Sequence, residues 1–387
     1  MLTRFAVKNY KCLADVDIPL TPIHVLIGEN DTGKTSLLEA MYAFHRSSTS
    51  QQVAQAFPGI WDGTDLVNER ASEPRIALSG EMGIDGENIG YGFTAQFGET
   101  RKRCLSGEEW IEVAAGRETL ADESARHHRT VLSERLSERG RWTNDTETLS
   151  RVLGRADLYR FDARMLATPT TIRVERKFRL DEDGFGLATL IDELLSYEFE
   201  LVAAIQSTFC RYFPQFRAVR LQTVKAMDRT YADDGTFNVS RGDGKGVFFE
   251  TTRGRLIRAQ QASDGALLFL GLLTLLHLPE PPKMLLFEEP ETGIYPKRLE
   301  EVITLLRDFI NNSSGRPVPQ IVITTHSPYV LTFFQPEEVT FMGRQPDGSV
   351  RARPLRDAPH IRERMEGGFY LGELWYNLTE AELFGDA

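Results

Sequence analysis

The stretch IHVLIGENDTGKTSLLEAMYAF, residues 23–44, decides the fold. Residues 23–27 are mostly large and apolar, which predicts a strand buried on both faces. Residues 34–44 carry apolar side chains at helical spacing, and the glycines before them mark a loop at the start of that helix. The loop itself, residues 28–35, matches the pattern GxxxxGK[ST], in which backbone N–H groups and the helix dipole hold phosphate. A surface glycine turn is the alternative, and the flanking strand and helix argue against it.

Each residue of this loop has an expected contact with the nucleotide. Lys34 is predicted to reach the β- and γ-phosphates, and Thr35 to bind Mg²⁺. Ser36, one residue further into the helix, is expected to donate to the α-phosphate. The predicted cofactors are therefore ATP and Mg²⁺. The residues predicted to bind the nucleotide here are Gly28, Glu29, Asn30, Asp31, Thr32, Gly33, Lys34, Thr35 and Ser36.

A second stretch, KMLLFEEPETGIYP at residues 283–296, places acids at the end of an apolar strand. Burying adjacent carboxylates without a positive partner is costly. Ligands of open α/β sheets bind at the carboxyl ends of the strands, so these acids are expected to face bound metal and water. Glu288 is predicted to bind Mg²⁺, and Glu289 to orient or deprotonate the attacking water. A solvated acid pair is the alternative. Glu291 precedes a helix and is read as a charge near its dipole.

A third strand, QIVITT at residues 320–325, ends beside His326. At that position we expect His326 to sense the γ-phosphate, although a lone histidine is more often structural. The predicted catalytic residues are thus Lys34, Glu289 and His326. His127 and His128 lie in a polar, Arg-rich segment and are read as solvated rather than metal-binding.

Composition limits the kinds of partner that fit this chain. It has 387 residues, 41% of them hydrophobic, a net charge of −11 and three widely spaced cysteines, which are expected to be reduced thiols. Such an acidic chain can meet nucleic acid only through a local basic patch. The longest apolar run, residues 266–276, is too short to span a bilayer, and the N-terminus lacks a secretory signal. The sequence predicts a cytoplasmic protein with no membrane contact.

The remaining pattern predicts an α/β fold with a mixed sheet. Alternating stretches at residues 2–27 and 75–97 indicate an antiparallel subdomain, and helices between buried strands after residue 260 indicate a parallel core. Helices and loops are expected from 99 to 170, and a turn at RGDGKG, residues 241–246. The predicted segments are an N-terminal part of the main domain (1–98), a mostly helical insert (99–245), a C-terminal part of the main domain (246–345) and a tail (346–387).

Together, these motifs resemble the ABC-type P-loop ATPase heads of the RecF, Rad50, SMC and OLD group. GENDTGKT is similar to their Walker A motif, MLLFEEPETGIYP to Walker B followed by the D-loop, and TTHS to the switch-histidine motif. QASDGALLFLGLL, from Gln261, resembles the degenerate signature motif, with Ser263, Asp264 and Gly265 at its core.

The resemblance implies a switch. Two heads would close face to face over two ATP molecules, and each signature segment would contact the γ-phosphate held by the other head. Ser263 suits this role, because an N-cap serine begins a helix whose N–H groups and dipole attract an anion. Hydrolysis would then loosen the dimer.

The sequence also departs from the group's pattern. Glu288 stands where Asp is commoner, and the Q-loop glutamine, expected on the metal side, is assigned to Gln96 as a candidate. Lys11 is either a nucleotide contact or a solvated lysine. The insert is too short for a Rad50 or SMC arm, and little sequence follows His326, which leaves no room for a TOPRIM nuclease domain. The resemblance therefore implies a stand-alone OLD- or RecF-like ATPase that works with a separate effector nuclease in bacterial anti-phage defence or DNA repair.

Three functions compete at this point. The first is an ATPase switch linked to double-stranded DNA, the second a slow or inactive ATP-dependent scaffold that holds a protein partner, and the third a transporter subunit. The third is disfavoured because ASDGA replaces the LSGGQ-type signature and a long insert precedes it. Two basic stretches are candidates for DNA contact, with solvated faces as the alternative, and their residues are Arg173, Arg176, Lys177 and Arg179, and Arg253, Arg255 and Arg258.

Overall fold

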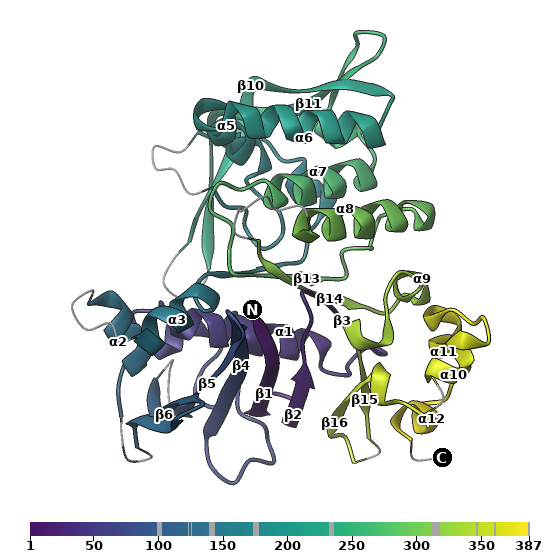
Figure 1. The fold of residues 1–387 in the computed structure, drawn as a ribbon. Coiled ribbons are helices and arrows are strands. Elements are labelled where there is room, and N and C mark those ends of the chain that lie inside the picture. The colour runs from purple at the N-terminus through teal and green to yellow at the C-terminus, as the bar shows by residue number, and fades with distance from the viewer. Residues whose placement is uncertain are drawn as a thin grey trace. The chain divides into compact units, whose positions relative to one another are not determined.

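The computed structural model divides the chain into two compact units (Figure 1). Unit 1 comprises Met1–Leu158, Pro282–Glu289 and Pro319–Ala387, and unit 2 comprises Tyr159–Pro281 and Pro290–Val318. The residues that the structure describes are 1–98, 103–122, 124, 126–138, 144–172, 178–231, 236–311, 318–345, 347–359 and 361–385.

The central sheet of unit 1 has the order β16-β15-β3-β14-β13-β8. Strand β14 pairs in parallel with β13 and with β3, β3 pairs in parallel with β15, and β15 and β16 are antiparallel. Every residue of β3 and β14 is buried, as the apolar runs predicted. The mixed sheet with a parallel core is confirmed. Its strands are β3 (Ile23–Ile27), β8 (Ala156–Tyr159), β13 (Met284–Glu288), β14 (Gln320–Thr325), β15 (Val339–Arg344) and β16 (Val350–Pro354).

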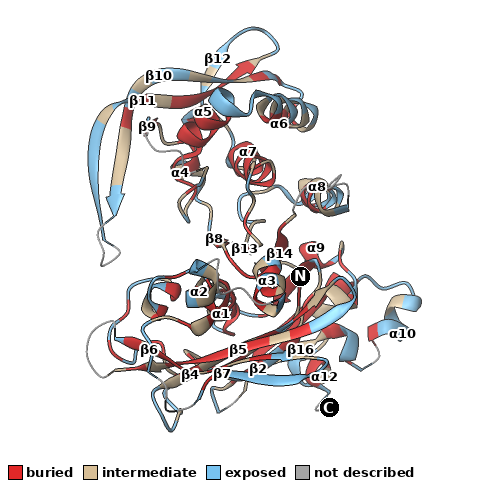
Figure 2. Cartoon of the chain, turned by 60° about the vertical axis from the view of Figure 1, so that its left-hand side comes forward, coloured by how far each residue is buried: buried red, intermediate tan, exposed pale blue. Residues whose placement is uncertain are grey.

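A second, antiparallel sheet in unit 1 has the order β2-β1-β4-β5-β6-β7. Helix α1 (Lys34–Ser47) carries apolar residues on its buried side, among them Phe44, whose ring lies 5.5 Å from that of Phe5 in β1. One core cluster joins these residues to Val322 of the central sheet, and Figure 2 shows the burial of α1 and of β5. The strands are β1 (Leu2–Tyr10), β2 (Leu13–Pro19), β4 (Arg75–Ile84), β5 (Glu87–Phe97), β6 (Cys104–Val113) and β7 (Gly116–Ala121).

In the region 99–170, predicted as helices and loops, the described residues include the strands β6, β7 and β8. The alternation of β6 was hidden because Glu109, a fully buried residue, stands where an apolar side chain is expected. Since β6 continues the sheet of β5, the compact units do not coincide with the predicted segment limits. The helices described in this region are α2 (Val131–Ser137), α3 (Asn144–Val152) and α4 (Ala163–Leu166).

Unit 2 combines helices with a long hairpin, β10 (Phe216–Tyr231) and β11 (Phe237–Thr251), which is completed by the short strands β9 (Thr170–Thr171) and β12 (Leu256–Arg258). The turn predicted at 241–246 is wrong, because these residues lie inside β11. A β-carbon at Gly244 would lie 2.2 Å from the carbonyl oxygen of Thr170, so the glycine allows a close approach of backbones rather than a turn. Besides α4, the described residues of unit 2 form the helices α5 (Leu187–Tyr197), α6 (Phe199–Tyr212), α7 (Asp264–Leu276) and α8 (Leu299–Asn311).

The C-terminal segment is a folded part of unit 1. Helix α11 (Leu371–Asn377) packs on α9 (Pro328–Leu331), the helix that follows the third strand end. Helix α12 (Glu380–Phe384) packs on β15, where the rings of Phe341 and Phe384 lie 4.9 Å apart (Figure 1). Helix α10 (Ile361–Glu366) precedes them. In the described part of the chain, no helix is long and apolar enough to cross a membrane.

Candidate nucleotide-binding site

Three strand ends meet in unit 1. Glu288 at the end of β13 pairs with Thr324 of β14, and Thr325 of β14 pairs with Ile27 at the end of β3. The carboxyl ends of the three parallel strands are therefore neighbours, as the position of their polar residues predicted.

The loop between β3 and α1 requires its two glycines. A β-carbon at Gly28 would lie 2.1 Å from the carbonyl oxygen of Met342, and Gly33 has a φ of 85°. A residue other than glycine at either position would require a shift of the backbone or a strained conformation. The hydroxyl of Thr32 donates to the carbonyl of Glu29 at 2.8 Å, which tightens the loop.

Lys34 is anchored within this loop. Lys34 is only 7% exposed, and its Nζ donates to the carbonyl oxygens of Gly28 at 2.8 Å and of Glu29 at 2.6 Å. An ammonium group carries three donors and no acceptor. Phosphate oxygens brought to the loop would therefore compete with these carbonyls for the same group, which fits the predicted role.

Thr35 and Glu288, the two residues predicted to bind magnesium, are in direct contact. The hydroxyl of Thr35 donates to Oε1 of Glu288 at 2.5 Å, although the residues are 253 positions apart. Hydroxyl and carboxylate oxygens suit Mg²⁺, which commonly takes one or two protein ligands and completes its shell with phosphate and water. No group of three or more His, Cys, Asp or Glu ligands occurs among the described residues. The donors present thus fit a magnesium ion shared with a nucleotide.

Glu289 and His326 form the second contact across the strand ends. Nδ1 of His326 lies 3.1 Å from Oε1 of Glu289, and both side chains are partly exposed. Glu289 has a φ of 46°, which is unusual for a residue other than glycine. Its N–H donates to both the carbonyl (3.1 Å) and the hydroxyl (3.2 Å) oxygens of Thr324, which hold this backbone in place. The sequence did not single out Thr324, because a buried threonine in a strand is a common β-former.

Gln96 is not brought to this site by any described contact. It lies in β5, where it pairs with Arg75 and Leu105 in the antiparallel sheet. Within the described part of the chain, no hydrogen bond links it to Thr35 or Glu288.

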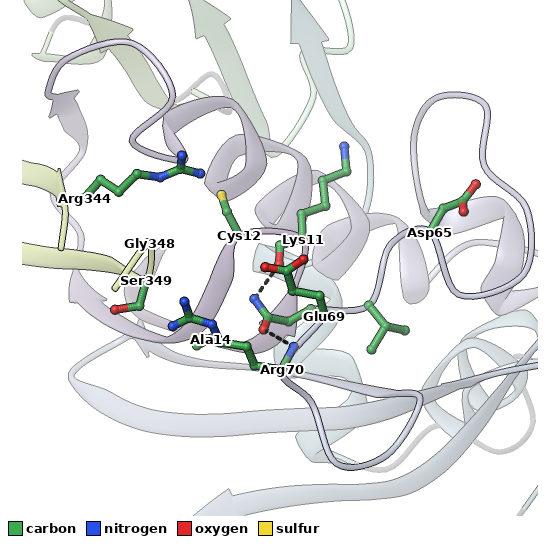
Figure 3. A pocket seen from close by; sticks show the side chains of 11 residues that line it. Lys11, Cys12, Ala14, Asp65, Glu69, Arg70, Arg344, Gly348 and Ser349 are labelled. Atoms are coloured by element: carbon green, nitrogen blue, oxygen red, sulfur yellow. Dashed lines mark hydrogen bonds between the residues drawn. The ribbon is translucent and has the colours of Figure 1, made fainter. Parts of the chain in front are cut away.

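Lys11 lines a pocket of about 350 Å³ (Figure 3). Its ammonium group forms an ion pair with Glu39 of α1, so it is not a lysine surrounded by solvent. Cys12, also in the pocket wall, would lie 2.9 Å from a β-carbon at Gly33. Two further lining residues, Arg70 and Arg344, were not predicted from the sequence, since lone surface arginines belong to no motif.

The signature segment belongs to unit 2 and lies at the start of α7. Ser263 occupies the N-cap position, as predicted, but its side chain makes no capping hydrogen bond. Ser263 and Asp264 are exposed. The D-loop lies beside them, since a β-carbon at Gly265 would be 3.4 Å from the carbonyl oxygen of Gly293. The Ser263 hydroxyl makes no capping hydrogen bond in the described structure, so it and the first N–H groups of α7 can bind an anion.

The exposed arginines of the second basic stretch lie in unit 2. The second lies on the β11–β12 side of unit 2 and is exposed at Arg253, Arg255 and Arg258. Of the first, only Arg179 is described, and it is exposed; Arg173, Arg176 and Lys177 lie outside the described residues. His127 and His128 are exposed, and neither belongs to a metal-ligand group within the described ranges.

The chain is similar to several known proteins. The model of the family described as "AAA domain, putative AbiEii toxin, Type IV TA system" matches residues 23–332. The OLD nuclease of Thermus scotoductus is 49% identical over 41 residues, 11% of this chain and 8% of that protein. The DNA replication and repair protein RecF of Latilactobacillus sakei is 34% identical over 83 residues, 20% of this chain and 22% of that protein. The chain thus matches less than a quarter of either relative's length.

The fold has a counterpart among solved structures. An SMC head crystallised with the C-winged helix domain of ScpA aligns with a TM-score of 0.57 at 14% sequence identity. The alignment covers 92% of this chain and 99% of that one. At this identity the likeness shows the fold alone.

Proposed function

The chain belongs to the family of AAA domains whose model it matches and has the ABC-type ATPase head fold of the RecF, Rad50, SMC and OLD group, and from this premise we propose that it binds and hydrolyses ATP. The observation that supports this most is the meeting of Lys34, the Thr35–Glu288 pair and the Glu289–His326 pair at adjacent strand ends.

Each residue has a defined task in this proposal. Lys34 and the N–H groups of the loop hold the phosphates, and Thr35 and Glu288 hold magnesium. The magnesium ion, when bound, neutralises charge on the β- and γ-phosphates. Glu289 orients the attacking water and accepts its proton, and His326, beside Glu289, donates a hydrogen bond toward the γ-phosphate. The pocket at Lys11 receives the nucleoside end of the same molecule.

ATP also joins two copies of the chain in this proposal. Ser263, Asp264 and Gly265 at the start of α7 contact the γ-phosphate held by the other copy. This is supported by the exposed N-terminus of that helix and by the Ser263 hydroxyl, which its own helix does not use. Loss of the γ-phosphate removes the anion between the copies, so hydrolysis opens the dimer.

The proposed setting is bacterial anti-phage defence or DNA repair with a separate effector nuclease. The names of two relatives, an OLD nuclease and a replication and repair protein, support it. Double-stranded DNA is a proposed partner through the exposed arginines of the β11–β12 side. The proposed location is the cytoplasm.

A slow or inactive ATP-dependent scaffold that holds a protein partner is the second candidate. The ASDGA signature and the Glu288 position, where Asp is commoner, favour it.

The ATPase rate of the purified chain, measured with and without duplex DNA across a range of salt concentrations, separates the two functions. The switch predicts magnesium-dependent turnover that DNA stimulates, with the stimulation falling steeply as salt rises. Turnover that is negligible and indifferent to DNA would contradict the switch and support the scaffold.

A further inference from the structure

Unit 1 has a second pocket, of about 260 Å³, on the side of the phosphate loop that carries the C-terminal helices. Phe341 of β15 and Trp375 and Tyr376 of α11 give it aromatic walls, and Glu29 and Glu380 place two carboxylates in it. Glu29 belongs to the phosphate loop and Glu380 begins α12, so residues from distant parts of the sequence form one site.

Glu29 and Glu380 both line this pocket. A β-carbon at Gly343 would lie 3.2 Å from Oε1 of Glu380, which places that carboxylate against β15. Burial, and after it the charge of Glu29, raises the pKa of Glu380. Within the described part of the chain, no Lys or Arg pairs with either side chain. The site therefore attracts a cation and repels phosphate, which makes it unsuitable as an extension of the nucleotide site.

Exposed aromatic side chains occur in the pocket and on neighbouring elements. Tyr376 is 77% exposed, and on the adjoining elements Tyr329 of α9 and Tyr370 at the start of α11 are 64% and 60% exposed. Aromatic residues exposed in this number are typical of protein interfaces, where tyrosine and tryptophan are enriched. They also favour an organic cation over a hydrated metal ion, because a ring face attracts a flat cation directly.

We propose that this pocket binds an arginine side chain presented by a separate protein partner. A guanidinium group is planar, so it can lie on the ring of Trp375 or Tyr376 while its N–H groups donate to Glu29 and Glu380. The chain's net charge of −11 favours a basic partner over a second copy of itself.

Glu29 connects this pocket to the phosphate loop. The carbonyl oxygen of Glu29 accepts hydrogen bonds from Lys34 at 2.6 Å and from Thr32 at 2.8 Å. A partner that holds the side chain of Glu29 thus contacts the residue to which the phosphate-binding lysine is anchored. The binding step itself does not depend on ATP hydrolysis and can be measured without nucleotide.

The test titrates the full chain with N-acetyl-arginine amide and follows indole fluorescence, with Trp375→Phe to identify the reporting residue. N-acetyl-citrulline amide has nearly the same shape without the charge and serves as the matched ligand. We expect a saturable signal with arginine and about tenfold weaker binding of citrulline, since charge-assisted hydrogen bonds are lost.

Variants assign the site. Glu380→Gln is expected to weaken arginine binding about tenfold, and Tyr376→Ala provides an independent change of an exposed ring. Glu366→Gln removes the same charge from the exposed end of α10, outside the pocket, and should leave binding unchanged. Equal binding of citrulline, or equal weakening by Glu366→Gln, would overturn the proposal. Self-association in sedimentation velocity that Glu380→Gln abolishes would replace the separate partner with a second copy.

Discussion

Two sets of carboxylates in unit 1 have their hydrogen bonds satisfied in opposite ways. Glu109 in β6 is fully buried and accepts hydrogen bonds from Tyr91 and from the backbone N–H groups of Val131 and Leu132. Glu288 and Glu289 at the end of β13 are partly exposed and contact Thr35 and His326. Glu109 therefore stabilises the fold. The partners of Glu288 and Glu289 are side chains that could bind a ligand instead.

The two sets of acids should therefore affect different properties of the protein: its stability and its activity. An acid whose partners are backbone N–H groups should matter for unfolding and little for nucleotide binding. An acid whose partners are side chains at strand ends should matter for catalysis and little for folding. Each of the following changes addresses one side of the comparison.

The largest effect is expected for Glu289→Gln. The amide keeps the shape of the side chain but cannot accept the proton of water, so turnover should fall by a factor of about 1000, while ATP binding persists and the dimer accumulates. Steady-state ATPase rates and size-exclusion chromatography with ATP measure both outcomes. A variant that turns over like the wild type would remove Glu289 from the mechanism.

The next effect is expected for Glu109→Ala. This change leaves three donors without an acceptor in the core, so the free energy of unfolding should fall by on the order of 3 kcal/mol. Glu108→Gln, on the same strand and paired with the exposed Arg117, is the control and should cost less than about 1 kcal/mol. Urea unfolding measures the free energy of unfolding of both variants. Equal losses would show that Glu109 stabilises the fold no more than a surface acid does.

A smaller effect concerns pH. Burial raises the pKa of Glu109 from 4.5 to about 7, against the opposing pull of its hydrogen bonds to Leu132, Val131 and Tyr91. Between these two values the folded state binds a proton that the unfolded state has lost, so this group's contribution to stability falls as pH rises. The loss should amount to about 2 kcal/mol between pH 5 and pH 7.5.

Glu109→Gln has no proton to exchange and should remove that slope. The comparison is the difference between wild-type and variant unfolding free energies at the two pH values. A difference that stays constant, or that changes in the opposite direction, would contradict the assignment.

The sequence predicted which side chains meet at the strand ends better than it predicted the surrounding structure. Lys34, Thr35, Glu288, Glu289 and His326 follow strands that are buried on both faces, and the carboxyl ends of parallel strands must share one edge of a sheet. Local pattern and topology therefore agreed at these positions.

Elsewhere the local pattern misled, because tertiary contacts decided the structure. The buried Glu109 interrupts the alternation of apolar residues in β6. The glycines in the middle of β11, which allow the close approach of β9, resemble a turn in the sequence. Gln96 was chosen for its place after a strand, whereas the structure puts it inside β5, so its role on the metal side stays a prediction. Thr324 and the aromatic pocket had no signal in the sequence, since each depends on residues far apart in the chain.

The most direct test of the nucleotide site is equilibrium binding of ATP with Mg²⁺ to the wild-type chain and to Lys34→Ala, measured by isothermal titration calorimetry. Lys34 anchors the loop and is the positive group at the strand ends, so the account predicts saturable binding by the wild type and a loss of at least about 100-fold in the variant. Unchanged affinity in Lys34→Ala would contradict it.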